Sequence, residues 1–137
     1  MKKAMILFLI LSACVLLYAS GGEKPTSELL VKSTTSWDGT KLPPYGMSAP
    51  EITILRISVP PHTDLSWHKH PVINAGVLVS GELTVISEKQ DTLYLKSGDQ
   101  IVEVVNTWHY GRNEGDEPAD IIVFYAGKKN KPVTIYK

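Results

Sequence analysis

Three histidines are the residues of this chain whose types and spacing could do chemistry. His68 and His70 stand in the stretch WHKHPVINAG, and His109 stands in NTWHYGRN. Side chains of a β-strand alternate between its two faces, so two histidines two residues apart point the same way. A histidine from a later strand can complete the same cluster. Three convergent imidazoles are typical of a divalent transition-metal site with open positions for water or substrate. Fe, Zn, Mn, Ni and Cu all suit such ligands, and ligand type alone does not choose among them.

The elements that must position these histidines are short strands. After residue 50, apolar runs alternate with turn residues at intervals of roughly 8–12 residues, and no long helical period follows. The spacing predicts strands at 52–59, 67–70, 76–79, 83–86, 93–95, 101–105 and 121–125, and a further strand that begins near 109. Such a series predicts an all-β antiparallel sandwich or barrel.

Composition narrows the classes of function. Lysine and arginine together number 14, and aspartate and glutamate also number 14, with no run of like charge. Nucleic acid is therefore not an expected partner. The single cysteine is Cys14, so the predicted domain has no intrachain disulfide and no thiolate chemistry. The length allows one domain with a core of its own.

The N-terminus predicts export. Lys2 and Lys3 precede an apolar run over residues 4–19, and small polar residues follow. This pattern is typical of a signal peptide, here residues 1–21, and of a periplasmic or secreted protein. The run is shorter than the roughly 20 residues that a membrane-spanning helix needs. Residues 22–46 are predicted to be a linker or N-terminal extension, and residues 47–137 the barrel domain.

Two alternatives to a cleaved signal peptide remain open. The first is an uncleaved N-terminal anchor. The second is a membrane-anchored lipoprotein, because Leu11-Ser12-Ala13-Cys14 resembles the bacterial motif that ends in a lipidated cysteine. A membrane is an expected partner only in these two cases.

The two histidine stretches resemble the two motifs of the cupin family. The first family motif places a Glu three or four residues after His-x-His, and a Gly six residues later. In this chain His68 and His70 are followed at these distances by Asn74 and Gly81. The second family motif is Gly, five residues, Pro-x-Gly, two residues, His, three residues and Asn. The segment from Gly98 to Asn113 keeps that spacing, with Val104-Val105-Asn106 in place of Pro-x-Gly and His109 as its histidine.

The resemblance covers roughly residues 50–127, and it implies both a fold and a site. The fold implied is a cupin-type double-stranded β-helix, also called a jelly-roll barrel, which is often a homodimer. The site implied is a metal in the barrel mouth, held by His68, His70 and His109.

Two departures from the family pattern bear on this expectation. Asn106 replaces the glycine of the second motif, and asparagine is the non-glycine residue that best holds a positive φ, so the turn can survive. Asn74 replaces the glutamate ligand, and a neutral amide is a weaker ligand that cannot act as a base. We expect Asn74 to be a weak ligand or a hydrogen-bonding neighbour of the metal site. The metal would then keep its full charge, which favours a small anionic or chelating ligand.

Two further residues are weaker candidates for a catalytic role. Glu103 could be a general base if it faces the metal; the alternative is a carboxylate on the rim. Arg56 could anchor an anion in the barrel mouth, because a guanidinium group binds a carboxylate bidentately. The alternative for Arg56 is a paired charge on an exposed face. Strand alternation sends Trp67 and Trp108 away from the metal, into the core or an interface; the alternative is that they stack on a ligand.

Three kinds of function remain open for such a protein. It could be a metal-dependent enzyme, either dioxygenase-like or isomerase- or lyase-like, in which the metal acts as a Lewis acid. It could instead be a non-catalytic cupin of the cell envelope that binds a small molecule or a metal. A purely structural cupin is the third possibility. A fold does not fix a reaction, and no motif encodes the substrate.

Overall fold

The computed structural model describes residues 29, 31, 33–46 and 49–137. The predicted signal peptide and Cys14 lie outside these residues. The described chain forms two antiparallel sheets, which confirms the predicted all-β double-stranded β-helix. No helix among the described residues is long and apolar enough to cross a membrane.

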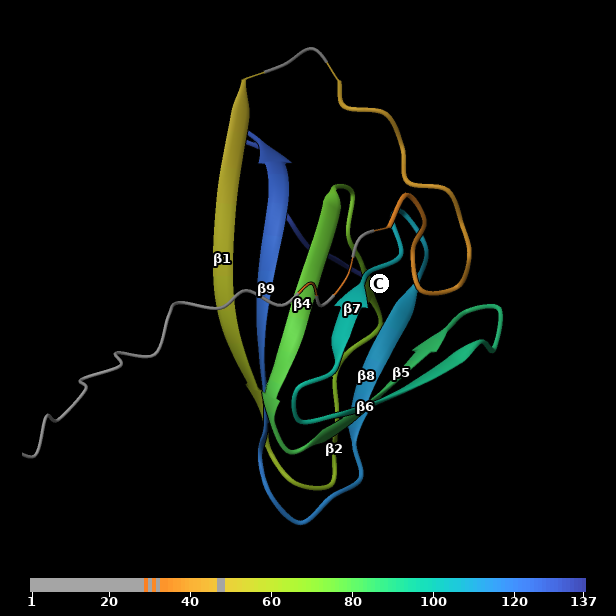
Figure 1. Ribbon diagram of the computed structural model, residues 1–137, viewed down its shortest axis with the longest axis vertical. Helices are drawn as coiled ribbons and strands as arrows, with labels where there is room; N and C mark the ends of the chain where they lie inside the picture. The colour runs from red at the N-terminus through yellow and green to blue at the C-terminus, as the bar shows by residue number, and fades with distance from the viewer. Residues whose placement is uncertain (1–28, 30, 32, 47–48) are drawn as a thin grey trace, which may run out of the picture.

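The first sheet has four strands side by side, and Figure 1 shows them as one layer. Their order is β1 (Pro50–Val59), β9 (Ala119–Lys128), β4 (Ile73–Ser80) and β7 (Gln100–Val102). The second sheet has the order β10 (Ile135–Tyr136), β3 (His68–Lys69), β8 (His109–Asn113), β5 (Glu82–Ser87) and β6 (Thr92–Lys96), with β2 (Thr63–Asp64) paired to β8.

Each predicted strand has a counterpart, but two are shorter than expected. The strand predicted at 101–105 ends at Val102, because the chain turns beyond it and Asn106 takes a positive φ of 57°. That angle confirms the expected role of asparagine in the turn. The strand predicted at 67–70 keeps only His68 and Lys69. The two-residue strands β2 and β10 were not predicted.

The core lies between the two sheets, and alternation along the strands builds it. On β9, Ile121, Val123 and Tyr125 are buried, whereas the intervening Phe124 is 51% exposed. Burying one large apolar side chain contributes roughly 1.5–3 kcal/mol, so the inward rows hold the two sheets together. The inward row consists of Val59, Val72, Leu78, Leu83, Val85, Leu95, Ile101, Ala119, Ile121, Val123 and Tyr125.

The outer face of the first sheet is also apolar. On the edge strand β1, Ile52 and Ile54 are 66% and 56% exposed. Ile54 lies opposite Phe124 of β9 in the antiparallel register. An exposed apolar patch of this kind is typical of an interaction surface.

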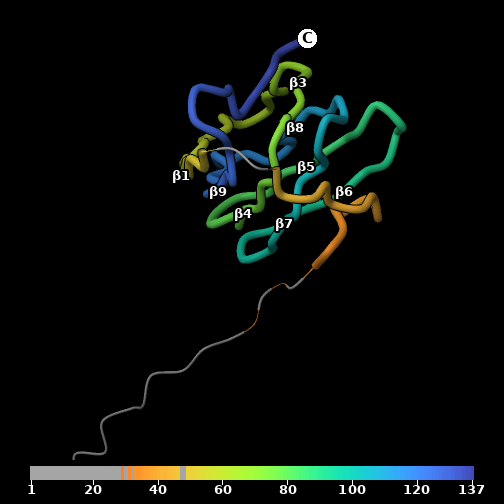
Figure 2. The backbone as a smooth tube through the Cα atoms, turned by 90° about the horizontal axis from the view of Figure 1, so that it is seen from above, coloured from red at the N-terminus to blue at the C-terminus, as the bar shows by residue number. Residues whose placement is uncertain are grey.

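The segment 33–42 packs against the barrel beside β7, as Figure 2 shows for the orange part of the chain. A bridge between Thr35 and Lys41 folds this segment back on itself. The amide of Trp37 then donates a hydrogen bond to the carbonyl of Val102 at 2.9 Å. The segment therefore lies beside β7, at the edge of the first sheet.

Asn113 ties the loops at one end of the barrel together. Its side chain is fully buried, and its Nδ2 donates hydrogen bonds to three backbone carbonyls. These belong to Val59 at 3.0 Å, Pro60 at 3.1 Å and Glu117 at 2.8 Å. Its Oδ1 accepts a hydrogen bond from the amide of Gly115 at 3.0 Å. The asparagine of the second motif thus joins the end of β1 to the turn before β9.

We predict that Asn113→Ala destabilises the barrel by about 2–4 kcal/mol, because it leaves several buried backbone groups without partners. Urea denaturation of the metal-free protein measures the change. Glu117→Ala is the matched control, because it removes an exposed side chain in the same turn and keeps the carbonyl that Asn113 binds. A loss below 1 kcal/mol for Asn113→Ala would contradict this role.

Candidate metal centre

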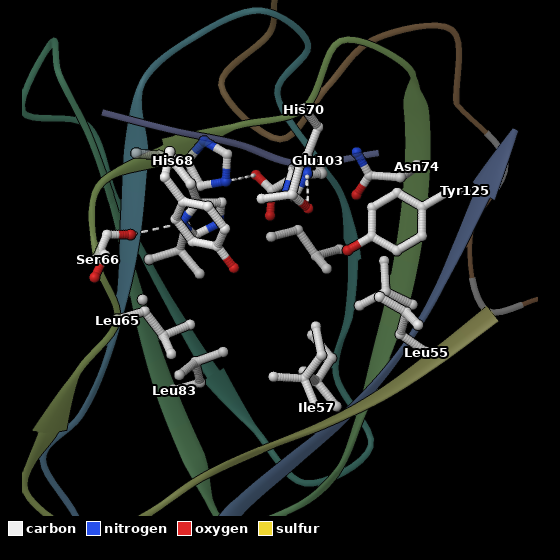
Figure 3. A pocket seen from close by; sticks show the side chains of 18 residues that line it. Leu55, Ile57, Leu65, Ser66, His68, His70, Asn74, Leu83, Glu103 and Tyr125 are labelled. Atoms are coloured by element: carbon white, nitrogen blue, oxygen red, sulfur yellow. Dashed lines mark hydrogen bonds and ion pairs between the residues drawn. The ribbon is translucent and has the colours of Figure 1, made fainter. Parts of the chain in front are cut away.

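A cavity of about 330 Å³ lies between the two sheets. Figure 3 shows that its polar side chains gather at one end, whereas leucine and isoleucine side chains line the other. The polar end contains His68, His70, Asn74 and Glu103, and the apolar end contains Leu55, Ile57, Leu65 and Leu83. His109 lies at the polar end too, beside the other two histidines and Glu103.

The three predicted histidines come together at the polar end. His68 on β3 lies directly opposite His109 on β8, so the two side chains share the inner face of the second sheet. His70 follows β3 and forms a bridge with Val105, and its carbonyl accepts a hydrogen bond from the Asn106 amide at 2.8 Å. Ring nitrogens of the three histidines all lie within 4.8 Å of one another. This arrangement could hold one metal ion.

Backbone carbonyls fix the tautomer of all three imidazoles. Each Nδ1 lies within hydrogen-bonding distance of a carbonyl oxygen, which can only accept, so each Nδ1 carries the proton. The carbonyls are those of Ser66 at 2.7 Å for His68, Val133 at 2.9 Å for His70 and Thr107 at 2.9 Å for His109. Each neutral ring therefore keeps a lone pair on Nε2, the atom left to bind a metal.

The Nε2 atom of His109 shows that this donor set fits a metal. It is a buried side-chain nitrogen without a hydrogen-bond partner in the described chain. A buried polar atom without a partner costs free energy, and a divalent metal would satisfy it. His70 is likewise buried, and His68 is half-buried.

Burial keeps two of the rings neutral. Desolvation lowers the pKa of His70 to about 3, although the hydrogen bond to Val133 opposes the change. Desolvation also lowers the pKa of His68, against the opposing hydrogen bond to Ser66. Neutral imidazole is the form that binds a metal, so these two ligands need not lose a proton to do so at neutral pH.

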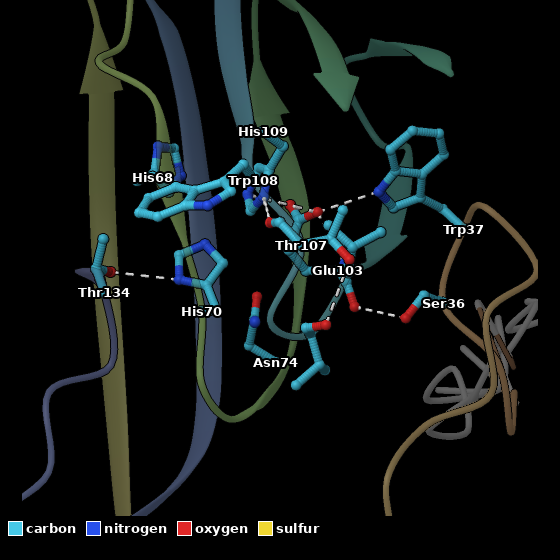
Figure 4. A network of polar contacts seen from close by, with 12 residues as sticks. Ser36, Trp37, His68, His70, Asn74, Glu103, Thr107, Trp108, His109 and Thr134 are labelled. Atoms are coloured by element: carbon cyan, nitrogen blue, oxygen red, sulfur yellow. Dashed lines mark hydrogen bonds and ion pairs between the residues drawn. The ribbon is translucent and has the colours of Figure 1, made fainter. Parts of the chain in front are cut away.

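Asn74 and Glu103 are the other polar groups of the cavity. Asn74 is buried on β4, and its Nδ2 donates to the carbonyl of Val72 at 3.3 Å. Glu103 is also buried, and its Oε1 lies 3.7 Å from Nε2 of His109. Figure 4 shows Trp37 directed towards the Glu103 carboxylate, and Trp37 Nε1 donates to Oε1 at 3.1 Å.

Arg56 lies away from this cavity, unlike the anion anchor considered from the sequence. Leu55 and Ile57 of β1 line the cavity, so alternation places Arg56 on the outer face. There it is largely exposed and lies 3.8 Å from Asp120. Arg56 is therefore a paired charge on an exposed face.

The two tryptophans beside the metal histidines point away from the cavity. Trp67 packs against Tyr110 with ring centroids 4.8 Å apart. Lys69 lies over the Trp108 ring, 4.7 Å from its centroid. These aromatic side chains cover the outside of the second sheet, so they cannot stack on a ligand held inside it.

Sequence reasoning missed two residues of the site, Tyr125 and Trp37. Tyr125 is buried, its hydroxyl points into the cavity in Figure 3, and burial raises the pKa of its phenol to about 12. The phenol therefore stays protonated and can donate a hydrogen bond. Alternation along 121–125 places Tyr125 inward, but nothing in the sequence places β9 beside the histidines. No periodic signal marks the segment that carries Trp37.

The comparison with protein families identifies the class. The family described as "Cupin domain" matches residues 55–125, which is more than half of the chain and includes all three histidines. The chain belongs to the cupin family. No curated protein matches it.

Solved structures support the same fold. A DMSP lyase from Ruegeria pomeroyi matches with a TM-score of 0.56 and 19% identity, over 63% of this chain and 43% of that one. A Klebsiella pneumoniae protein with a double-stranded β-helix domain matches with a TM-score of 0.54 and 18% identity, over 69% of this chain and 89% of that one. Oxalate decarboxylase from Bacillus subtilis, with Mn(II) centres, matches with a TM-score of 0.52 and 23% identity, over 62% of this chain and 23% of that one. At these identities the likeness shows the fold alone, and the chain spans less than half of the DMSP lyase.

We predict that acid destabilises the metal-free protein through His70. Its pKa is about 3 when folded, below the ordinary 6.5, so the unfolded chain binds more protons once the pH falls below 6.5. Stability is unaffected above that pH and should fall by about 2 kcal/mol between pH 7 and pH 5. Urea denaturation at the two pH values measures this fall.

His70→Gln should reduce this pH dependence, because glutamine does not titrate, and the lowered pKa of His68 should leave a smaller remainder. His62→Gln is the control, since His62 is an exposed histidine outside the cavity. Equal stability of the wild type at pH 7 and pH 5 would contradict the buried, neutral state of His70.

Proposed function

We propose that this cupin is an exported, metal-dependent enzyme that acts on a small anionic or chelating molecule. The observation that carries the proposal is the convergence of three imidazole nitrogens at the polar end of an apolar cavity, in rings whose Nδ1 atoms lie against backbone carbonyls. His68, His70 and His109 would hold the metal. When bound, the metal supplies a Lewis acid and, if it is redox-active, a centre for reaction with oxygen. Three protein ligands leave positions open for a substrate.

The cavity also constrains the substrate. Among the described residues, those that line it include no lysine or arginine. An anionic headgroup would therefore depend on the metal for its charge partner, with the Tyr125 phenol as a hydrogen-bond donor. The opposite end, with Leu55, Ile57 and Leu83, suits a compact apolar body. These features favour a monoanionic chelator with an apolar substituent over a sugar or a polyanion.

Two reaction classes fit this arrangement, a dioxygenase-like reaction and an isomerase- or lyase-like reaction. The first needs a redox-active metal such as iron, and the second needs only a Lewis acid. The Mn(II) centres of oxalate decarboxylase are consistent with a metal in a barrel of this fold. The apolar walls contribute in both cases, because they exclude water and strengthen electrostatic interactions within the site.

A non-catalytic binder is the second candidate, and Asn74 is the observation that favours it. The amide at the place of the family glutamate cannot act as a base. Such a protein would bind the same class of chelating anion and release it unchanged.

We further propose that the protein works in the periplasm or outside the cell, on the basis of the N-terminal pattern in residues 1–21. The exposed apolar face with Ile52, Ile54 and Phe124 supports a homodimer.

Metal-loaded protein should turn over a member of this substrate class. The assay loads the protein with Fe(II), Mn(II) or Zn(II) and offers small carboxylic acids and β-diketones with apolar substituents. An oxygen electrode detects oxidation, and proton NMR detects elimination or isomerisation. We predict that His109→Ala lowers any turnover more than 100-fold, because it removes a metal ligand. His62→Ala, which changes an exposed histidine, should have no effect.

Metal-dependent ligand binding without turnover would favour the binder. The absence of both metal-dependent turnover and metal-dependent binding would contradict both candidates.

Asn74→Glu should retain the metal and change ligand preference. The added carboxylate lowers the net charge beside the metal, so binding of an anionic ligand should weaken. Isothermal titration calorimetry with a carboxylate ligand measures the change. Asn74→Gln is the matched control, because it lengthens the side chain in the same way without adding charge. Equal anion affinity in the two variants would contradict the proposed charge effect.

A further inference from the structure

We infer that Glu103 supplies the anionic group that Asn74 does not. We also infer that the segment 33–42, called the N-terminal segment below, holds the Glu103 carboxylate in place through Trp37. The inference rests on the proposed metal dependence and deepens it. It assigns Glu103 to the charge balance of the metal, and it makes Trp37 a positioning residue.

The two side chains are neighbours across the first sheet. On β4 and β7, Ala75 lies opposite Val102 and Gly76 lies opposite Ile101. The next pair in this register is Asn74 and Glu103, and the Glu103 amide donates to the Asn74 carbonyl at 3.0 Å. Directly opposed residues share a face, and their Cβ atoms lie roughly 4.5–5.5 Å apart. Both side chains line the cavity, so the carboxylate stands one strand away from the usual position of the acid.

Among the described residues, the Glu103 carboxylate is buried without a permanently charged lysine or arginine partner. Its residue is 8% exposed, and no lysine or arginine in the described part of the chain forms an ion pair with it. Its Oε1 accepts hydrogen bonds from Trp37 Nε1 at 3.1 Å and from the Val104 amide at 3.0 Å. A buried carboxylate is costly unless its charge is balanced. The environment therefore favours a cation close by.

The histidine beside Glu103 points to the place of that cation. In the neutral form of His109, whose Nδ1 proton is committed to the Thr107 carbonyl, Nε2 carries a lone pair. That lone pair lies 3.7 Å from Oε1 of Glu103, which is too long for a hydrogen bond. In that form two acceptors face each other inside the protein, whereas a protonated ring would form an ion pair with Glu103. A divalent metal bound by Nε2 of His109 would attract both atoms.

The N-terminal segment holds Glu103 through both its backbone and its side chain. Ser36 Oγ donates to the Glu103 carbonyl at 2.9 Å, and the Trp37 amide donates to the Val102 carbonyl at 2.9 Å. The Trp37 indole then donates to the carboxylate itself. Figure 4 shows Ser36 and Trp37 approaching Glu103 from the side opposite His70. A segment outside the family's two motifs thus orients a group beside the metal site.

Glu103→Gln tests the charge alone, because glutamine keeps the size of the side chain and an oxygen for the two hydrogen bonds. We expect the affinity for Zn(II) to fall about 10–100-fold, as for other groups beyond the metal ligands. Competition with a chromophoric chelator measures the affinity. Trp37→Phe should give a smaller loss in the same direction. Glu82→Gln, an exposed glutamate on β5, is the matched control and should retain wild-type affinity.

A double variant separates charge balance from a structural role. Asn74→Glu should restore Zn(II) affinity in the Glu103→Gln background, because it returns an anion to the opposed position. The visible spectrum of the Co(II)-loaded protein should change in Glu103→Gln and not in Glu82→Gln. Circular dichroism checks the fold of each variant. If Glu103→Gln does not fold, Trp37→Phe decides the question.

The outcomes distinguish this inference from the function on which it rests. Wild-type affinity in Glu103→Gln, with binding abolished in His109→Ala, would overturn the role of Glu103 and leave the metal site standing. If Glu103→Gln does not fold, wild-type Zn(II) affinity in Trp37→Phe would overturn the proposed role of Glu103. A wild-type protein that binds no divalent metal would instead overturn the proposed function.

Discussion

Three hydrogen bonds between imidazoles and backbone carbonyls are the constraint on which the site depends. A neutral imidazole has one donor and one acceptor, and in each of His68, His70 and His109 the donor is committed to the backbone. The lone pairs are then left for the cavity, where one lies buried without a partner. Because the carbonyls belong to the barrel itself, the same fold that places the three rings also decides which nitrogen each ring presents.

The rest of the barrel gives this cluster a low-dielectric and electrically asymmetric setting. Apolar residues close one end of the cavity, and the positively charged Arg56 lies outside it. Glu103 is the acidic group among the residues that line the cavity in the described chain, and Trp37 holds it from a segment outside the barrel strands. The site therefore combines a centre of neutral ligands with one buried carboxylate, placed across the sheet from Asn74.

The sequence predicted the strands and the three histidines because their signals are local. Apolar runs and turn residues mark each strand, and His-x-His fixes two side chains on one face. The face of Arg56 was harder to predict, because Ile52 and Ile54 make the outer face of β1 as apolar as the inner one. Glu103 and Trp37 meet across 66 residues of chain. No local pattern encodes such a contact, because it depends on how the segment around Trp37 packs beside β7.

The three-histidine centre is tested most directly by the tautomeric state of its rings, measured by two-dimensional proton–nitrogen NMR of the ¹⁵N-labelled, metal-free protein at neutral pH. We predict that His68, His70 and His109 all carry the proton on Nδ1. We also predict that one equivalent of Zn(II) shifts the Nε2 resonance of all three rings together. A proton on Nε2 of any of these rings, or a response to zinc in fewer than three of them, would contradict a three-histidine metal centre.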